Sequence, residues 1–230
     1  MSHKKKRSGF WRWARRIWLV LLFSTLAFVG WLWWAQQATP SYWVVIDTSD
    51  PVYAQEADRF EQWSHATFSK SRPLGEPWRF EITQDQANGW LATRLDLWEA
   101  NRGWELPKEM MYPMVAVREG KMILAVEVHA EKGRKILGIT VGAAANPEGG
   151  PVTLEITDIS IGRINVSYER AMKTFEDYNM PQMADALVSY REQLQEAKLV
   201  FSLADGREVE ILDIAFHHER AVLTCRTRRP

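Results

Sequence analysis

Residues 17–35, IWLVLLFSTLAFVGWLWWA, are the stretch that organises this 230-residue chain. The stretch contains no charged residue. As a helix rising 1.5 Å per residue it is about 28 Å long, close to the ~30 Å hydrocarbon core of a bilayer. The preceding residues 1–16 carry seven Lys and Arg and no Asp or Glu. We therefore expect a basic cytoplasmic segment at 1–16 and a transmembrane helix at 17–35.

Tryptophans gather at both ends of this stretch, where an indole ring with its single N–H donor favours the headgroup region. The flanking tryptophans expected to anchor the helix are Trp18, Trp31, Trp33 and Trp34, and Trp43 follows a little later. A cleaved signal peptide is one alternative, but its apolar run spans about 7–15 residues and ends in small residues. A buried core helix is another, but such a helix rarely lacks a polar face for five turns.

The charge bias across the helix predicts an uncleaved signal-anchor in the inner (plasma) membrane with a cytoplasmic N-terminus. Residues 36–49 are then a linker, and residues 50–230 form an extracytoplasmic domain. The whole chain has 29 basic and 29 acidic residues, so without residues 1–16 its net charge is −7. Because an acidic domain repels phosphate, we expect no nucleic-acid partner. Cys225 is the single cysteine, which excludes an internal disulfide and a thiolate zinc site.

The first half of the domain contains helix and strand signals. Asp50 and Pro51 have the residue types of an N-cap and a first helical position, and the helix that follows ends before Pro73. Residues 78–82 alternate apolar and charged side chains, which predicts a strand.

A second helix is predicted to begin at Thr83. Thr83 and Gln86 have the spacing of a capping box, in which each side chain binds the other residue's free N–H. Asn88 and Gly89 lie near the apolar side of this helix, although both are poor helix formers. We interpret Asn88 as a buried amide with its hydrogen bonds satisfied, and Gly89 as a site of close backbone packing.

From Tyr112 the apolar period changes to two, which predicts antiparallel strands with short connections. The strands expected in this meander are 114–118, 121–131, 135–145 and 152–161. Apolar stripes then predict two helices, the first with Tyr168 and Phe175, the second with Met183, Leu187, Tyr190, Leu194 and Ala197. A closing meander is expected over 198–203, 208–216 and 221–227. The fold class is therefore α+β.

No pattern in the sequence predicts an enzyme, a metal site or a cofactor. His217 and His218 are adjacent at a predicted turn and would point to opposite faces of a strand, so we interpret them as an exposed turn. Glu127 and His129 share a strand face, which we interpret as a solvated sheet edge. Neither a glycine-rich phosphate loop nor a nucleophile motif occurs.

Apolar surface is the remaining functional signal. The strand through residues 122–126 is apolar on both faces and must be covered on both sides. The helix stripe and the small residues of the next strand are candidates to meet it, either as a filled core or as the wall of a pocket. The candidate ligand-binding residues are Trp90, Leu91, Leu95, Trp98, Met122, Leu124, Val126, Gly142 and Ala144.

Three segments together resemble a known family: ITQDQANGWL at 82–91, the Glu119-Gly120 turn, and LEITDISIG at 154–162, which runs into a helix. With the basic N-terminus and single transmembrane helix, they resemble the small single-pass bacterial membrane proteins of the YpmS type. They are more distantly similar to LmeA-like proteins, whose fold resembles tubular lipid-binding domains. The resemblance implies a curved antiparallel sheet packed with amphipathic helices around an apolar groove.

These observations lead to a prediction with one alternative. We expect a membrane-anchored extracytoplasmic domain that binds lipid or another apolar ligand, with the bilayer as its permanent partner. The alternative is a non-catalytic scaffold that binds another protein of the cell envelope. A scaffold would carry its apolar surface outside, whereas a binding protein would carry an unfilled pocket inside.

Overall fold

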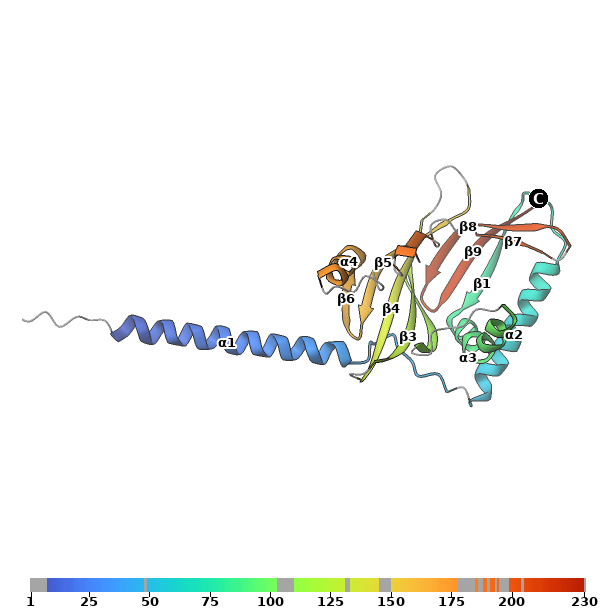
Figure 1. Ribbon diagram of the computed structural model, residues 1–230. Helices are drawn as coiled ribbons and strands as arrows, with labels where there is room; N and C mark the ends of the chain where they lie inside the picture. The colour runs from blue at the N-terminus through green and yellow to red at the C-terminus, as the bar shows by residue number, and fades with distance from the viewer. Residues whose placement is uncertain are drawn as a thin grey trace, which may run out of the picture.

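The computed structural model describes residues 8–47, 49–102, 110–130, 133–144, 150–177, 185, 188–189, 191–192, 194, 199–203 and 205–229. Figure 1 shows one long helix, α1, projecting from a body of sheets and shorter helices. The helices are α1 (Ser8–Gln37), α2 (Pro51–Ser69), α3 (Gln84–Arg102) and α4 (Tyr168–Asp177). The strands are β1 (Pro77–Thr83), β2 (Met110–Arg118), β3 (Lys121–Ala130), β4 (Gly133–Ala144), β5 (Thr153–Ile161), β6 (Ile164–Ser167), β7 (Val200–Ser202), β8 (Glu208–His217) and β9 (Arg220–Arg228).

Two antiparallel sheets form from the described strands, which confirms the predicted α+β class. Sheet A has the order β1-β9-β8-β7, and sheet B has the order β2-β3-β4-β5-β6. The sequence predicted the two meanders but not that they form separate sheets. It also missed β6, which pairs with β5 after a turn at Gly162. Most of the predicted helix through Met183 and Ala197 lies outside the described residues, although Leu194 is helical.

Helix α1 is long and apolar enough to span a membrane over Arg15–Gln37, and its apolar window is not buried in the rest of the chain. The four predicted anchoring tryptophans lie on it, each more than half exposed: Trp18, Trp31, Trp33 and Trp34. A soluble protein rarely leaves such a continuous apolar surface in water.

The end of α1 is held against sheet B. The Arg163 backbone N–H donates to the Ala35 carbonyl at 2.9 Å, and the Arg163 Nε donates to the Thr39 carbonyl at 2.9 Å. Gly162 has φ +58°, and a Cβ there would lie 2.3 Å from the Gln36 carbonyl oxygen. Only glycine combines this backbone conformation with such a close approach. The β5–β6 turn therefore docks the helix to the domain.

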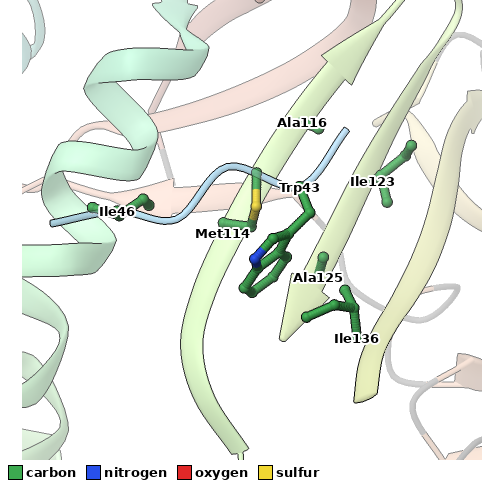
Figure 2. Packing of buried hydrophobic residues seen from close by; sticks show 7 residues of the cluster. All are labelled: Trp43, Ile46, Met114, Ala116, Ile123, Ala125 and Ile136. Atoms are coloured by element: carbon green, nitrogen blue, oxygen red, sulfur yellow. The ribbon is translucent and has the colours of Figure 1, made fainter. Parts of the chain in front are cut away.

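The segment after α1 packs on one face of sheet B. Trp43, which follows the predicted anchoring tryptophans, is buried in a cluster formed with β2, β3 and β4. Figure 2 shows its indole ring lying among Met114, Ala125 and Ile136. Residues 38–47 thus lie along the sheet, which leaves little freedom between α1 and the body.

Capping groups start α2 and α3 as predicted. The Asp50 carboxylate accepts from the Val52 N–H at 2.9 Å. Thr83 N–H donates to the Gln86 Oε1 at 3.0 Å, and Gln86 N–H donates to the Thr83 Oγ1 at 3.2 Å. These bonds satisfy N–H groups that a helix start leaves unpaired.

Helix α3 joins the two sheets by pairing with the free edge of β2. The Asn88 amide donates to the Val115 carbonyl at 2.9 Å and accepts from the Val115 N–H at 2.7 Å. One turn earlier, Gln84 accepts from the Val117 N–H at 2.9 Å. Gln84 and Asn88 are four residues apart and lie on one helix face, so their side chains reach Val117 and Val115, which are two residues apart on the strand. The interpretation of Asn88 as a satisfied buried amide is confirmed.

Gly89 lies where α3 crosses α2. A Cβ at this position would lie 2.7 Å from the Tyr53 carbonyl oxygen, closer than real Cβ atoms approach. The predicted close backbone contact at Gly89 is therefore confirmed. The two helices lie together at the end of the body away from α1 (Figure 1).

Candidate apolar ligand site

A cavity of about 520 Å³ lies between helices α2 and α3 and the inner face of sheet A. Its lining is almost entirely apolar. The lining residues are Phe60, Glu61, Ser64, Phe68, Phe80, Ile82, Trp90, Phe201, Leu203, Val209, Ile211, Leu223 and Cys225. The volume falls within the range of about 300–1,000 Å³ that small-molecule sites occupy.

The floor of the cavity follows from strand alternation. Phe80 of β1 lies opposite Leu223 of β9, and Cys225 lies opposite Ile211 of β8. Because alternate residues point to the same face, these side chains all turn inward. Their neighbours Arg79 and Thr224 line a polar depression on the outer face of sheet A.

The roof comes from α2. Phe60, Ser64 and Phe68 are spaced by four residues and so share one face of the helix. Phe68 lies 4.9 Å from the Phe80 ring, and Trp63 stacks on Phe80 at 4.3 Å. Such aromatic pairs contribute about 0.5–1.5 kcal/mol each beyond area burial. They hold α2 on the sheet while the cavity remains beside them.

Four lining residues carry polar side-chain atoms: Glu61, Ser64, Trp90 and Cys225. Glu61 is directed toward Arg94, with Glu61 Oε1 3.6 Å from Arg94 Nε. The Ser64 hydroxyl is buried without a hydrogen-bond partner among the described residues. Burial raises the pKa of the Cys225 thiol to about 11. Because a thiol with that pKa stays protonated near neutral pH, Cys225 contributes apolar surface and not a nucleophile.

The residues predicted to bind a ligand separate into two groups. Trp90 lines the cavity. Leu91 and Met122 instead pack in a filled cluster with Val115, Val117, Phe216 and Ala221, where sheet B meets sheet A. Leu95 is buried, and Trp98 is 40% exposed with its ring 6.5 Å from that of Trp90.

The remaining predicted residues lie on sheet B. Leu124 and Val126 share a face with Ile139 and Leu137 of the adjacent strand, and Leu124 is 39% exposed. A Cβ on Gly142 would meet Thr157 Cγ2 at an ordinary 3.6 Å. Ala144 is half-buried at the end of β4. The structure thus does not bring this group together with Trp90 around one cavity.

The polar groups considered in the sequence lie at the β8–β9 turn and on β3. The predicted exposed turn is confirmed for His218 and Glu219, whereas His217 is the half-buried last residue of β8. The interpretation of Glu127 as solvated is wrong, because its carboxylate is buried and lies 2.6 Å from His129 Nε2 and 3.4 Å from Arg134. Within the described part of the chain, no three His, Cys, Asp or Glu side chains are grouped to hold a metal ion.

Sequence reasoning missed most of the cavity because it comes from elements far apart in the chain. The spacing of Phe60, Ser64 and Phe68 was visible as part of an amphipathic helix. No sequence signal indicated that this helix covers the last meander instead of the first. Comparisons of the sequence with known protein families and with curated proteins find no match. The resemblance to YpmS-type and LmeA-like proteins stays a prediction.

Proposed function

We propose that this protein is a membrane-anchored binding protein that holds an apolar ligand, such as an acyl chain, in the cavity between α2, α3 and sheet A. The observation that carries the proposal is the cavity itself, about 520 Å³ of space with an almost wholly apolar lining. The cavity is open to solvent at one side, where Phe201 is exposed, so its apolar lining stays in contact with water. An apolar ligand would remove that lining from water, which is favourable.

The size of the cavity suits one acyl chain. A water molecule takes about 30 Å³ in the liquid, and a methylene group is of similar size, so the cavity holds about 17 such groups. Each buried methylene contributes about 0.8 kcal/mol. Eight of them would therefore contribute about 6 kcal/mol before the cost of ordering the chain.

The position of the cavity suggests how the anchor serves this function. Helix α1 leaves the body at the end opposite α2 and sheet A (Figure 1). With α1 in the inner membrane and the N-terminus in the cytoplasm, the cavity faces away from the bilayer. A ligand bound there has left the membrane but stays within one domain's length of it. This arrangement suits a protein that holds an apolar molecule between the bilayer and an acceptor beyond it.

The test compares two variants of the full-length chain by native mass spectrometry after detergent removal. Val209→Phe adds volume inside the cavity, because Val209 is a fully buried lining residue. Gly142→Leu adds volume on sheet B, outside the cavity. We expect the wild type and Gly142→Leu to carry a lipid adduct and Val209→Phe to lose it. If the wild type carries no lipid, and Val209→Phe loses the 1–3 kcal/mol of stability typical of overpacking a filled core, the scaffold alternative is favoured.

A further inference from the structure

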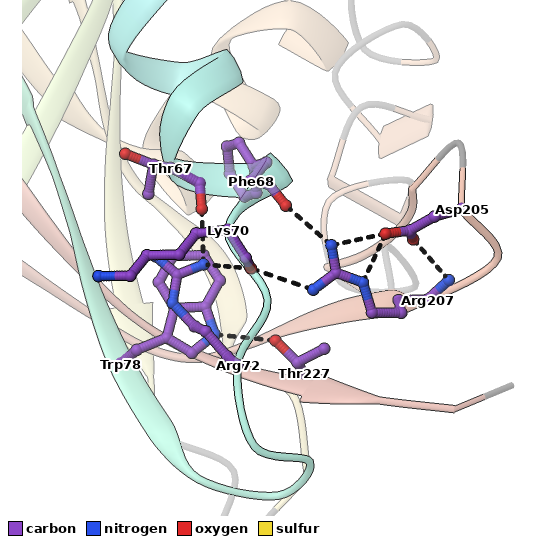
Figure 3. Close-up of polar contacts among 8 residues, drawn as sticks. All are labelled: Thr67, Phe68, Lys70, Arg72, Trp78, Asp205, Arg207 and Thr227. Atoms are coloured by element: carbon purple, nitrogen blue, oxygen red, sulfur yellow. Dashed lines mark hydrogen bonds and ion pairs between the residues drawn. The ribbon is translucent and has the colours of Figure 1, made fainter.

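A cluster of cations lies at the end of the cavity where α2 finishes. Figure 3 shows Arg72 and Arg207 beside the last turn of α2, with the Lys70 carbonyl between them and the Lys70 ammonium directed away. Arg207 binds Asp205 at 2.7 Å. Among the described residues, neither Lys70 nor Arg72 has a carboxylate within ion-pair distance. The cluster therefore keeps an excess of positive charge.

Contacts connect this cluster directly to the cavity wall. Phe68 and Leu203 both line the cavity. The Phe68 carbonyl accepts from Arg207 Nη2 at 3.2 Å, and the Leu203 N–H donates to the Arg207 carbonyl at 2.7 Å. The Phe68 ring meets the Trp78 ring edge-on at 5.7 Å. Arg207 thus contacts two residues of the cavity wall directly, and Arg72 is connected to Phe68 through the Trp78 ring.

All three nitrogens of Arg207 are already engaged within the protein. Its Nε binds Asp205, its Nη1 donates to the Lys70 carbonyl at 3.1 Å, and its Nη2 binds both Phe68 and Asp205. Cationic side chains commonly satisfy the last carbonyls of a helix in this way. Arg207 therefore has a structural role at the end of α2.

Arg72 is different, because it uses only one of its three nitrogens. Its Nη1 donates to the Thr67 carbonyl and, at 3.5 Å, to the Lys70 carbonyl. Its guanidinium lies 3.9 Å from the centroid of the Trp78 ring. Trp78 is itself fixed, since its indole N–H donates to the Thr227 hydroxyl at 3.1 Å. Arg72 is thus a half-buried cation on a rigid platform, with Nε and Nη2 making no hydrogen bond to the described residues.

The electrostatic environment of Arg72 favours a bound anion. Burial lowers the pKa of Arg72, and the charge of Arg207 lowers it further. Both effects make the bare cation less favourable than in water, and an anion beside it reverses them. A planar guanidinium with two free donors matches the oxygens of a carboxylate or a phosphate.

We propose that the cavity takes a single-chain amphiphile with an anionic head group, and that Arg72 binds that head group at the cavity's end. This inference rests on the proposed function of the cavity and adds the chemical class of the ligand. A single-chain amphiphile fits both the volume and the position away from the bilayer, because one chain leaves a membrane far more easily than two.

Photolabelling of the full-length chain in phosphatidylcholine nanodiscs tests the inference. The three probes share one diazirine-bearing C16 chain and end in a carboxylate, a phosphate or a neutral alcohol. After irradiation and digestion, label on peptides from α2 and β8 is divided by label on peptides from α1, which corrects for partition into the bilayer. A charge-assisted hydrogen bond is worth about one factor of ten or more in affinity. We expect the two anionic probes to label the cavity peptides about tenfold more than the alcohol.

Arg72→Met keeps the length of the side chain and removes the charge, so it should lower carboxylate labelling to the level of the alcohol. Arg79→Met is the matched control, because Arg79 lies one residue from Trp78 but on the outer face of sheet A. Equal labelling by the anionic probes and the alcohol in the wild type overturns the anion site and leaves the proposed function standing. Absence of label from the cavity peptides with all three probes overturns both. Comparison of the three probes on the wild-type chain tests the anion site even if Arg72→Met fails to fold.

Discussion

Asn88 is the residue whose loss should most affect stability without touching the cavity. Its amide exchanges two hydrogen bonds with the backbone of Val115 on the edge of sheet B. Asn88→Ala removes both and leaves a buried N–H and a buried carbonyl without partners. Each unsatisfied group costs about 1–3 kcal/mol, so we expect a loss of about 4 kcal/mol. Alanine's better helix propensity returns about 0.5 kcal/mol of that.

That loss is a large share of the 5–15 kcal/mol typical of a folded domain. For a domain of 150–250 residues, the net loss of about 3.5 kcal/mol corresponds to a fall in Tm of about 7–14 °C. The assay is thermal unfolding of the full-length chain in detergent, followed by tryptophan fluorescence. Asn165→Ala is the control, because Asn165 is exposed on β6 and should change stability by less than about 0.5 kcal/mol. If Asn88→Ala unfolds at the same temperature as Asn165→Ala, α3 does not hold the sheets together as described.

Three further predictions concern single side chains. Gly162→Ala places a Cβ against the end of α1 at a residue with positive φ, so it should make residues 38–47 accessible to added protease. Gly120→Ala is the control, because Gly120 also has a positive φ (+72°) but a Cβ there meets no other atom. Cys225, with its pKa raised to about 11, should resist iodoacetamide at pH 8 until the chain unfolds. Because an unfolded thiol ionises near pH 9, stability should also fall as the pH rises from about 9 to 11. Ser64→Ala removes a buried hydroxyl without a hydrogen-bond partner, so it should raise the free energy of unfolding in chemical denaturation by up to about 1 kcal/mol. Thr93→Ala breaks a 2.7 Å hydrogen bond to the Gly89 carbonyl and should not raise the free energy of unfolding.

Local elements could be predicted from the sequence because local chemistry determines them. The Thr83–Gln86 capping box and the Asp50 N-cap need only neighbouring residues, and both form as expected. Asn88 and Gly89 were informative because they break helix propensity, which a chain tolerates only where a contact compensates. The structure supplies that contact for each of them.

The packing of helices against sheets could not be predicted, because the sequence does not show which apolar helix face covers which sheet. Trp43 suits a membrane interface as well as a core, and only the position of residues 38–47 on sheet B decides between them. Leu91 and Met122 both pack against the cluster of Val115, Val117, Phe216 and Ala221, away from the cavity. The cavity instead lies under α2, on a sheet whose strands come from both ends of the domain.

A crystal structure with a brominated fatty acid tests the central claim most directly. The bromine atom, placed midway along the chain, gives an anomalous signal that locates the ligand without interpretation of weak density. We expect one bromine site between Phe60 of α2 and Val209 of β8, with the carboxylate directed toward Arg72. A bromine site beside Leu124 on sheet B, or none in the protein, would show that this cavity does not bind the chain.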